Sequence, residues 1–368
     1  MKAVFTPDAC DGQARAGQVH TARGSFETPC FMPVGTRGAV RLLDSKDLEG
    51  LGVEVILANT YHLMLRPGVD VVADLGGIHE FAGWSGHMLT DSGGYQVFSL
   101  GADVDDGGAV FRSVYDGSSC RITPEDAVAK QSLIGADMTM VLDICPSARV
   151  SKEAHRIAVD RSAAWAQRAR DAFQSSASSE AQCQFGIVQG GTHSDLRLES
   201  ASRTVDIGFD GYAVGGLSVG EERADMFEAL DVAMSVLPED QPRYFMGLGD
   251  PAGIVEAVSR GVDMFDCVFP TRLARHGTVL SSTGRYNLDQ ASHANSSEPL
   301  DPFFPDGPAG RYSKGYLRHL LTVKEPTAGR LLTLHNLAWL LRFMQRIRAS
   351  IRAGNFTEIR EQVDRVWA

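Results

Sequence analysis

Short apolar stretches recur along most of the chain and alternate with longer amphipathic segments. We expect eight of these stretches to be β-strands, because each is short, rich in aliphatic residues and bounded by turn residues. Their ranges are Cys30–Val34, Val53–Asn59, Met88–Asp91, Met138–Asp143, Phe185–Gln189, Tyr212–Gly216, Tyr244–Gly247 and Met264–Phe269. Helices are expected between them, including Thr123–Ile134 and Lys152–Phe173. The alternation predicts an α/β fold, and eight parallel strands predict a (β/α)8 TIM barrel.

The pattern changes near residue 280. Residues 292–310 are rich in Ser, Pro, Asp and Gly, which predicts a long loop, and helical segments follow. We therefore expect a barrel with the catalytic pocket over residues 1–280 and a C-terminal helical subdomain over residues 281–368, packed on the barrel. The competing fold, a doubly wound open sheet, is disfavoured because its Gly-x-Gly-x-x-Gly turn is missing.

Composition narrows the class of protein. With 43% hydrophobic and 22% charged residues in 368, the chain is typical of a globular protein and not of a collagen-like or disordered one. No run of about 18 apolar residues is present and no signal-peptide core opens the chain, so we expect a cytoplasmic protein without a membrane partner. The formal charge of −11 argues against a dedicated nucleic-acid-binding protein, although an enzyme can carry a local basic patch.

Polar or glycine-bearing clusters follow nearly every expected strand, and in a barrel they all fall at the carboxyl face, where active sites are built. Asp91 ends one strand and precedes a turn containing Ser92, Gly93 and Gly94, whose backbone N–H groups could approach a ligand closely. Asp91 is either a general acid/base or the N-cap of the next helix. Asp143, at another strand tip, is either a similar cap or an acceptor for the paired N–H donors of a base such as guanine.

The following strand ends complete a pocket. Gln189 offers an amide, and Gly216 with Leu217 offers an unhindered backbone, both suited to a carbonyl oxygen of the base. Tyr95 and Met246 could sandwich a flat ring, although such residues are more often core. Asp266 interrupts an otherwise apolar strand, a costly placement unless function or pairing offsets it. As a carboxylate it could attack an anomeric carbon, with Asp91 as its acid/base partner.

Four motifs in this order and spacing give the chain a specific resemblance. LeuThrAspSerGlyGlyTyrGlnValPhe, IleValGlnGlyGly, GlyGlyLeuSerValGlyGlu and MetPheAspCysValPheProThrArg are similar to those of bacterial tRNA-guanine transglycosylase, also called queuine tRNA-ribosyltransferase. The resemblance extends from about Phe5 to the C-terminal helices. It implies an irregular (β/α)8 barrel and a pentosyltransferase of queuosine biosynthesis. Such an enzyme replaces guanine at the wobble position of tRNA with a GUN anticodon by 7-aminomethyl-7-deazaguanine.

The resemblance also implies roles for single residues. Asp266 would form a covalent ribosyl-enzyme and Asp91 would act as acid/base, while Asp143, Gln189 and Gly216 would bind the edge of the base. The Leu217 carbonyl would meet the aminomethyl group, and Cys145 and Val219 match the bacterial pattern. The positions implied to contact tRNA are Gly247, Asp250, Gly253, Thr271, Arg272 and Arg275. A homodimer is likewise implied by the resemblance alone.

The chain departs from the family at a structural zinc site. Family members carry three cysteines there, followed by a histidine, but the aligned cysteine positions are Phe304, Asp306 and Ala309, and only His335 is retained. One histidine and one aspartate cannot complete a tetrahedral structural site, so we expect no metal and no cofactor. Phe304 and its neighbours could form an apolar plug instead. Ile144 beside Asp143 is a second departure, since bacterial relatives are expected to have an acidic residue there.

Two alternatives to the tRNA reaction remain. A zinc-less paralogue could exchange a guanine or deazaguanine base on a nucleotide or on DNA, because the zinc subdomain shapes the tRNA-binding surface in the family. A non-catalytic subunit is the other, and the presence of both Asp91 and Asp266 argues against it.

Overall fold

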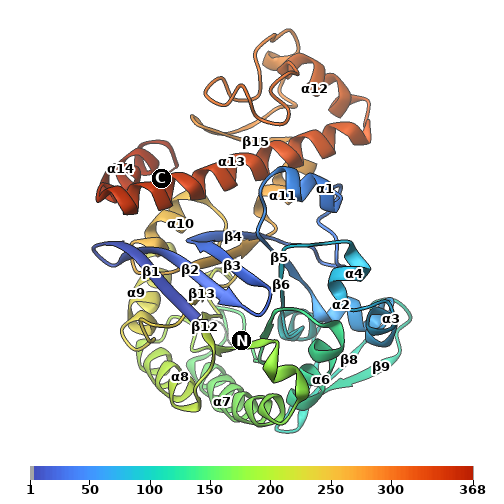
Figure 1. The fold of residues 1–368 in the computed structure, drawn as a ribbon, viewed down its shortest axis with the longest axis vertical. Helices are drawn as coiled ribbons and strands as arrows, with labels where there is room; N and C mark the ends of the chain where they lie inside the picture. Colours follow the sequence, from blue (N-terminus) through green and yellow to red (C-terminus); the bar gives the residue numbers. More distant parts are fainter. Residues whose placement is uncertain (1–3, 368) are drawn as a thin grey trace.

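The computed structural model describes residues 4–367, and its centre is an eight-stranded parallel barrel (Figure 1). The strands are β4 Cys30–Pro33, β5 Val55–Ala58, β6 His87–Thr90, β10 Met138–Met140, β11 Cys183–Val188, β12 Gly211–Val214, β13 Arg243–Phe245 and β14 Met264–Cys267. The hydrogen-bonded order runs β4-β14-β13-β12-β11-β10-β6-β5. A single parallel bridge between Val34 and Leu57 joins the two ends and closes the barrel.

The predicted fold class and all eight predicted strands are confirmed. Each observed strand lies within or overlaps its predicted range, and most end earlier because the polar residues at their tips leave the ladder to form loops. The two helices predicted by range are also present, as α6 Pro124–Ile134 and α7 Lys152–Gln174. Thr123 caps α6 by accepting a hydrogen bond from the Asp126 amide, as its Thr-Pro-Glu-Asp sequence indicates.

Helices between consecutive strands cover the outside of the barrel. They are α1 Ser45–Gly50, α2 Thr60–Leu65, α3 Val69–Asp74, α4 Ile78–Ala82, α5 Gly94–Ser99, α8 Ser194–Ile207, α9 Arg223–Met234, α10 Pro251–Val258 and α11 Phe269–Arg275, with the short 3-10 helix η1 Ala177–Glu180 after α7. All the residues of the central strands β10, β11, β12 and β13 are buried, because helices cover their outer side and other strands their inner side.

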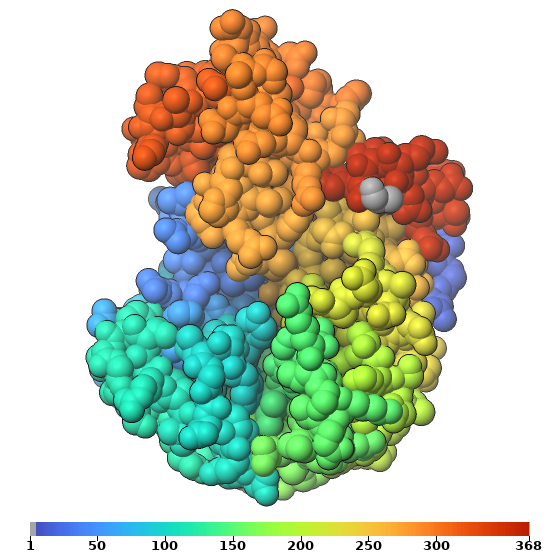
Figure 2. Space-filling model, turned by 180° about the vertical axis from the view of Figure 1, so that it is seen from behind, coloured from blue at the N-terminus to red at the C-terminus, as the bar shows by residue number. Residues whose placement is uncertain are grey.

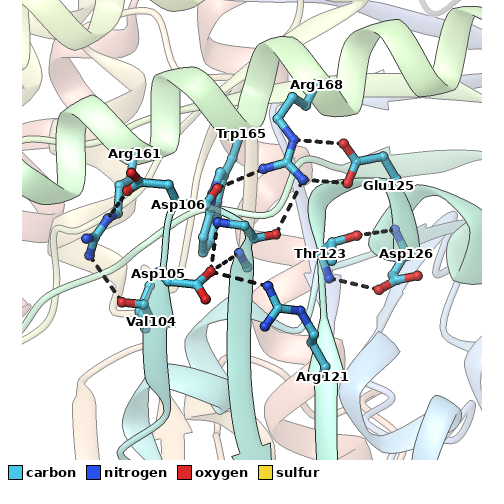
Figure 3. A network of polar contacts seen from close by, with 12 residues as sticks. Val104, Asp105, Asp106, Arg121, Thr123, Glu125, Asp126, Arg161, Trp165 and Arg168 are labelled. Carbon is cyan, nitrogen blue, oxygen red and sulfur yellow. Dashed lines mark hydrogen bonds and ion pairs between the residues drawn. The ribbon is translucent and has the colours of Figure 1, made fainter.

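Two three-stranded antiparallel sheets were not predicted. One consists of β1 Val4–Asp11, β2 Ala14–Thr21 and β3 Gly24–Thr28, and the other of β7 Asp103–Asp105, β8 Gly108–Arg112 and β9 Ser119–Ile122. Figure 3 shows how the second is tied to α7: Arg168 contacts both carboxylate oxygens of Glu125 at 2.7 Å and the Asp106 carbonyl at 2.8 Å. Trp165 donates to the same carbonyl at 2.9 Å. These contacts fix the position of a sheet that follows the Asp91 turn.

The C-terminal part consists of β15 Thr278–Ser281, β16 Gly284–Asn287, the short η2 Ala291–His293, α12 Lys314–Thr322, α13 Pro326–Ala353 and α14 Phe356–Trp367. Between η2 and α12 the chain forms turns without helix or strand, as the composition of this stretch indicates. The long helix α13 runs across the top of the barrel in Figure 1, with α12 on its far side. Its buried residues belong to both the barrel core and a smaller core beneath α12, and the boundary near residue 280 stays a prediction.

Within residues 4–367, no helix has the length and apolar character needed to cross a membrane. A buried ion pair lies at the amino end of β14. Arg15 donates through two guanidinium nitrogens to Asp263, at 2.9 and 2.6 Å, and both side chains are almost completely shielded from solvent. Burial raises the pKa of Asp263, while Arg15 opposes that effect. Such pairs are costly to break because the remaining charge has no partner.

Candidate functional site

Asp91 lies directly after β6 and is surrounded by hydrogen-bond donors. Its carboxylate accepts from the Asn59 side chain at 2.5 Å, the Thr60 amide at 2.8 Å and the Gly93 amide at 3.2 Å. Burial raises its pKa to about 6, although these donors favour the ionised form. A carboxyl group with that pKa can both give and take a proton near neutral pH, as the predicted acid/base role requires.

The glycines after Asp91 allow the turn to approach two other elements. Gly93 has a φ of +81°, and a Cβ atom there would lie 3.2 Å from the Tyr61 amide. A Cβ atom on Gly94 would lie 2.8 Å from the Asp143 carbonyl and 3.1 Å from its carboxylate. Ser92 is buried and its hydroxyl accepts from the Gly94 amide at 3.2 Å. The turn therefore brings the ends of β6 and β10 together, which places Asp91 close to Asp143.

Asp143 is buried and shares its pocket with Gln189. The Gln189 amide group donates to the Asp143 carboxylate at 2.5 Å, and its own oxygen has no hydrogen-bond partner in the described part of the chain. Burial raises the pKa of Asp143 to about 6, and the charge of Asp91 acts in the same direction. The unsatisfied Gln189 oxygen and the adjacent Asp143 carboxylate suit a ligand rich in N–H donors.

Gly216 leaves the space that the Gln189 side chain occupies. Its φ is +67°, and a Cβ atom there would overlap the Gln189 amide oxygen at 2.2 Å. Arg197 secures the neighbouring loops from a completely buried position, donating to the carbonyls of Val188 and Gly215 at 3.0 and 2.8 Å. The ends of β11 and β12 are thus fixed in a geometry that only glycine permits.

Asp266 lies on β14, near the carboxyl end of the barrel. Its carboxylate accepts a hydrogen bond from the Tyr244 hydroxyl at 2.5 Å and one from the Gly247 amide at 2.8 Å. Burial raises the pKa of Asp266, and both donors oppose that effect by stabilising the anion. Burial raises the pKa of Tyr244 well above its usual value, and the charges of Asp266 and Asp91 contribute, so Tyr244 stays a donor. Both carboxylates therefore lie close enough to the Tyr244 hydroxyl to affect its pKa.

The remaining predicted base-binding residues differ in exposure. Tyr95, in the first turn of α5, is 59% exposed, while Leu217 is buried after β12. Met246 is partly buried, and its sulfur would lie 3.5 Å from a Cβ atom on Gly215. On the face shown in Figure 2, a hollow separates the orange C-terminal segment from the cyan and green parts of the barrel.

The predicted RNA-contacting residues form two groups. Asp250 caps α10 by accepting from the Gly253 amide at 2.8 Å, and it also pairs with Arg223. Thr271 is buried and Arg272 is exposed on α11. Thr271–Arg275 belong to a helix and not to a loop. These residues form α11 because Pro270 suits the first turn of a helix, and the helix carries Arg272 and Arg275 one turn apart.

The side chains at the family's zinc positions do not fit the metal. His335 is buried and its Nε2 donates to the Leu280 carbonyl at 2.9 Å, while burial lowers its pKa and keeps it neutral. The Phe304 ring lies 6.1 Å from the His335 ring, Ala309 is buried in an apolar cluster and Asp306 is exposed. Among residues 4–367, no three His, Cys, Asp or Glu side chains are arranged to hold a metal. Phe304 packs against the core, but Phe303 is exposed and takes no part in an apolar plug.

Sequence reasoning assigned no role to three groups that the structure adds to the site. Tyr244 holds Asp266, Asn59 and Thr60 hold Asp91, and Arg197 holds the β11 and β12 ends. Asn59 and Thr60 do belong to a polar cluster at a strand end, which is the signal that could have identified them. Tyr244 and Arg197 lie in ordinary strand and helix sequence without such a signal.

Comparison with known proteins agrees with this geometry. The family model described as queuine tRNA-ribosyltransferase matches residues 10–368. A queuine tRNA-ribosyltransferase from Thermotoga petrophila is 47% identical over 358 residues, covering 97% of this chain and 96% of the relative. Proteins of the same name from Solidesulfovibrio magneticus and Halothermothrix orenii are each 45% identical, covering 99% and 95% of this chain and 98% and 93% of theirs.

Proposed function

This chain belongs to the queuine tRNA-ribosyltransferase family of pentosyltransferases, and from that premise we propose that it exchanges a base in tRNA during queuosine synthesis. In the proposed reaction, guanine leaves the wobble position of a tRNA with a GUN anticodon and 7-aminomethyl-7-deazaguanine takes its place. The observation that carries the proposal is the pair of partly buried carboxylates, Asp91 and Asp266, each held by its own donors at the carboxyl end of the barrel.

We propose a double displacement for the chemistry. The ionised carboxylate of Asp266 attacks C1′ of the ribose, a C–O bond forms and the bond from C1′ to the base nitrogen breaks. Asp91 supplies the proton that the departing guanine needs. In the second half, Asp91 takes a proton from the entering base, whose nitrogen attacks C1′ and releases Asp266. Donors from Tyr244 and Gly247 support the nucleophile because they favour its anionic form.

Recognition of the base is supported by the Asp143 carboxylate and the unpartnered Gln189 oxygen. Asp143 would accept from the N–H and exocyclic NH2 of guanine, and the Gln189 and Gly216 region would contact the carbonyl edge. Tyr95 and Met246 would lie against the ring, and the Leu217 carbonyl would face the aminomethyl group. The proposed tRNA contacts are the positions named from the sequence, with Arg272 and Arg275 presented from one face of α11.

We also propose that the C-terminal subdomain folds without zinc and that the protein forms a homodimer. The first proposal is supported by the apolar surroundings of His335, whose ring is flanked by Phe304 in place of a thiolate. The second is supported by Tyr312 and Tyr316, which stack 5.5 Å apart and leave Tyr316 46% exposed on α12. Light scattering of the purified protein measures its mass in solution, and a monomer at micromolar concentration would contradict the dimer.

The experiment that tests the reaction is incorporation of labelled guanine into unmodified tRNA with a GUN anticodon, beside a guanine nucleotide and duplex DNA. We expect label only in tRNA, at the wobble position, and none with Asp266→Asn. Label only in the nucleotide or DNA would show a paralogue with a different acceptor. Activity of Asp266→Asn equal to the wild type would refute the covalent mechanism.

A further inference from the structure

A cavity of about 320 Å³ opens between α13, α14 and the turn that joins β15 to β16. It is distinct from the barrel pocket, since none of the carboxylates described above lines it. Its floor contains Trp339 and Phe343, whose rings stack 5.6 Å apart at an interplanar angle of 15°. Phe303 lines it too and is 65% exposed, the most exposed large apolar side chain in the described residues. The cavity therefore offers flat aromatic surface in a volume within the range of ligand pockets.

Two guanidinium groups, Arg342 and Arg346, line the same cavity from consecutive turns of α13. Arg342 lies 4.8 Å from the centre of the Phe304 ring and donates to the Phe303 carbonyl at 3.2 Å. Arg346 donates to the neutral Gln362 side chain at 2.5 Å. No carboxylate in residues 4–367 forms an ion pair with either. The positive charge of the two side chains in the cavity is therefore uncompensated. Their mutual repulsion, four residues apart on one helix, adds to the cost of this arrangement.

The other arginines of α13 show that this arrangement is specific to the cavity. Arg330 pairs with Asp47, Arg348 with Glu27, and Arg352 with both Asp8 and Glu27. The two arginines without a carboxylate partner are the two that line the cavity. In a chain of net charge −11, a pair of unmatched guanidinium groups on one helix points to an anionic ligand.

The remaining polar groups of the cavity are not acidic. Ser282 and Thr283 contribute hydroxyl groups from the β15–β16 turn. Asp301, from the segment between η2 and α12, is buried, and its oxygens already accept from the Ser282 amide and hydroxyl and from the Phe303 amide. Its hydrogen bonds fix the turn and the Phe303 backbone, so the cavity rim is held in place from two sides.

We propose that this cavity binds one nucleotide of an RNA strand outside the reacting base, with the phosphodiester between Arg342 and Arg346 and the base stacked on Phe303. Guanidinium groups are suited to phosphate, and an exposed aromatic ring is the usual stacking surface for an unpaired base. Free phosphate would use the arginines but not the aromatic rim. The source of the strand, the tRNA substrate, rests on the proposed function.

The proposed site also gives a role to Phe304, which occupies one of the family's zinc positions, and to its neighbour Phe303. Phe304, at the first of these positions, carries the Arg342 guanidinium on its ring, and Phe303 beside it forms the rim. The segment that no longer fits a metal therefore shapes the wall of an RNA-binding cavity. The proposal gives Phe304, the aromatic residue at one of the family's cysteine positions, a function besides packing.

Two variants separate the charge from the stacking contribution. We expect Arg346→Gln to weaken binding of unmodified tRNA by about three- to tenfold and to lower the slope of log affinity against log salt by about one, because one phosphate contact is lost. Phe303→Ser is expected to weaken binding by about tenfold without changing that slope. Arg203→Gln is the matched control, since it removes the same charge from α8, on the opposite side of the barrel (Figure 1).

Binding is measured by anisotropy of labelled tRNA on the full chain, with circular dichroism to confirm that each variant is folded. Unchanged affinity and slope in both variants, or an equal loss in Arg203→Gln, would overturn the site. Tighter binding of guanosine monophosphate than of a single-stranded RNA oligonucleotide would overturn the assignment to an RNA strand. Guanine exchange run in parallel distinguishes the two proposals. If the wild type exchanges guanine and the variants bind tRNA as tightly as the wild type, only the cavity proposal is rejected. If the wild type shows no exchange but the variants bind tRNA more weakly than it does, only the proposed reaction is rejected.

Discussion

Removing the Tyr244 hydroxyl tests how Asp266, the proposed nucleophile, is kept ionised. Tyr244→Phe retains the buried ring but deletes the 2.5 Å hydrogen bond to Asp266, leaving the Gly247 amide as its remaining donor. A hydrogen bond to a charged group stabilises it by about 1.5–3 kcal/mol, and about 1.4 kcal/mol corresponds to one pKa unit. Since burial already raises the pKa of Asp266, we expect a further rise of roughly one to two units in the variant.

The assay is the pH dependence of kcat/KM for guanine exchange into tRNA. A nucleophilic carboxylate is active when ionised, so activity falls as the pH drops through its pKa. In Tyr244→Phe the acidic limb should therefore move to higher pH, while the rate on the alkaline side stays within a few fold of the wild type. Asn59→Ala, which removes a donor from Asp91 instead, serves as a comparison. An acidic limb at the same pH in Tyr244→Phe and the wild type would refute the proposed role of the hydroxyl.

Three further outcomes follow from the structure. Gly216→Ala should raise the KM for guanine by at least tenfold and lower thermal stability, because the new methyl group overlaps the Gln189 amide oxygen and the φ of +67° is strained. Titration with guanine measures the KM and thermal melts measure the stability. Unchanged values would count against the assigned pocket. Chelator treatment should leave the melting temperature unchanged, and elemental analysis showing one equivalent of zinc would refute the zinc-free fold. Arg15→Met should lower the free energy of unfolding by about 3–5 kcal/mol in urea titrations, since Asp263 would remain buried without its partner; a loss below about 1 kcal/mol would contradict this account.

The barrel could be predicted because its strands are buried on both faces. Met138–Asp143 is recognisable as one apolar run even though only Met138–Met140 forms ladder hydrogen bonds, since Val141 and Leu142 are as buried as the strand itself. The small sheets lack that signal. In β7 the residues Asp103–Asp105 are mostly exposed, so no apolar run marks a strand, and the sheet depends on contacts with α7 that lie far away in the sequence.

The positions of the catalytic candidates could be predicted, but not the contacts that set their chemistry. Asp91 stands out as a carboxylate at the end of an apolar run, and Asp266 as a carboxylate that interrupts one. The bond from Tyr244 to Asp266 depends on the parallel register of β13 and β14, in which Tyr244 is paired with Met264. A register between strands is fixed by the packing of the whole barrel, so the sequence of either strand alone does not determine it.

The proposed reaction requires opposite protonation states of Asp91 and Asp143. The proposed reaction needs a proton on Asp91 when guanine leaves, and an ionised Asp143 to accept the N–H groups of that guanine. Burial raises the pKa of both to about 6, and the charge of Asp91 also raises the pKa of Asp143, so each carboxyl is protonated in only a part of the molecules near neutral pH. In the free enzyme, donors from Asn59, Thr60 and Gly93 favour ionised Asp91, while Gln189 favours ionised Asp143.

Bound guanine changes that balance. Its N–H groups add donors to Asp143 alone and stabilise the ionised form of that carboxylate, and the charge of Asp143 then favours the protonated form of Asp91. Base binding would therefore prepare the acid that the departing base needs, and a base without the exocyclic NH2 would prepare it less well. The consequence is measurable as a lower kcat, and not only a higher KM, when hypoxanthine replaces guanine as the base in the anticodon. Equal kcat values for the two bases would show that Asp91 is protonated independently of Asp143.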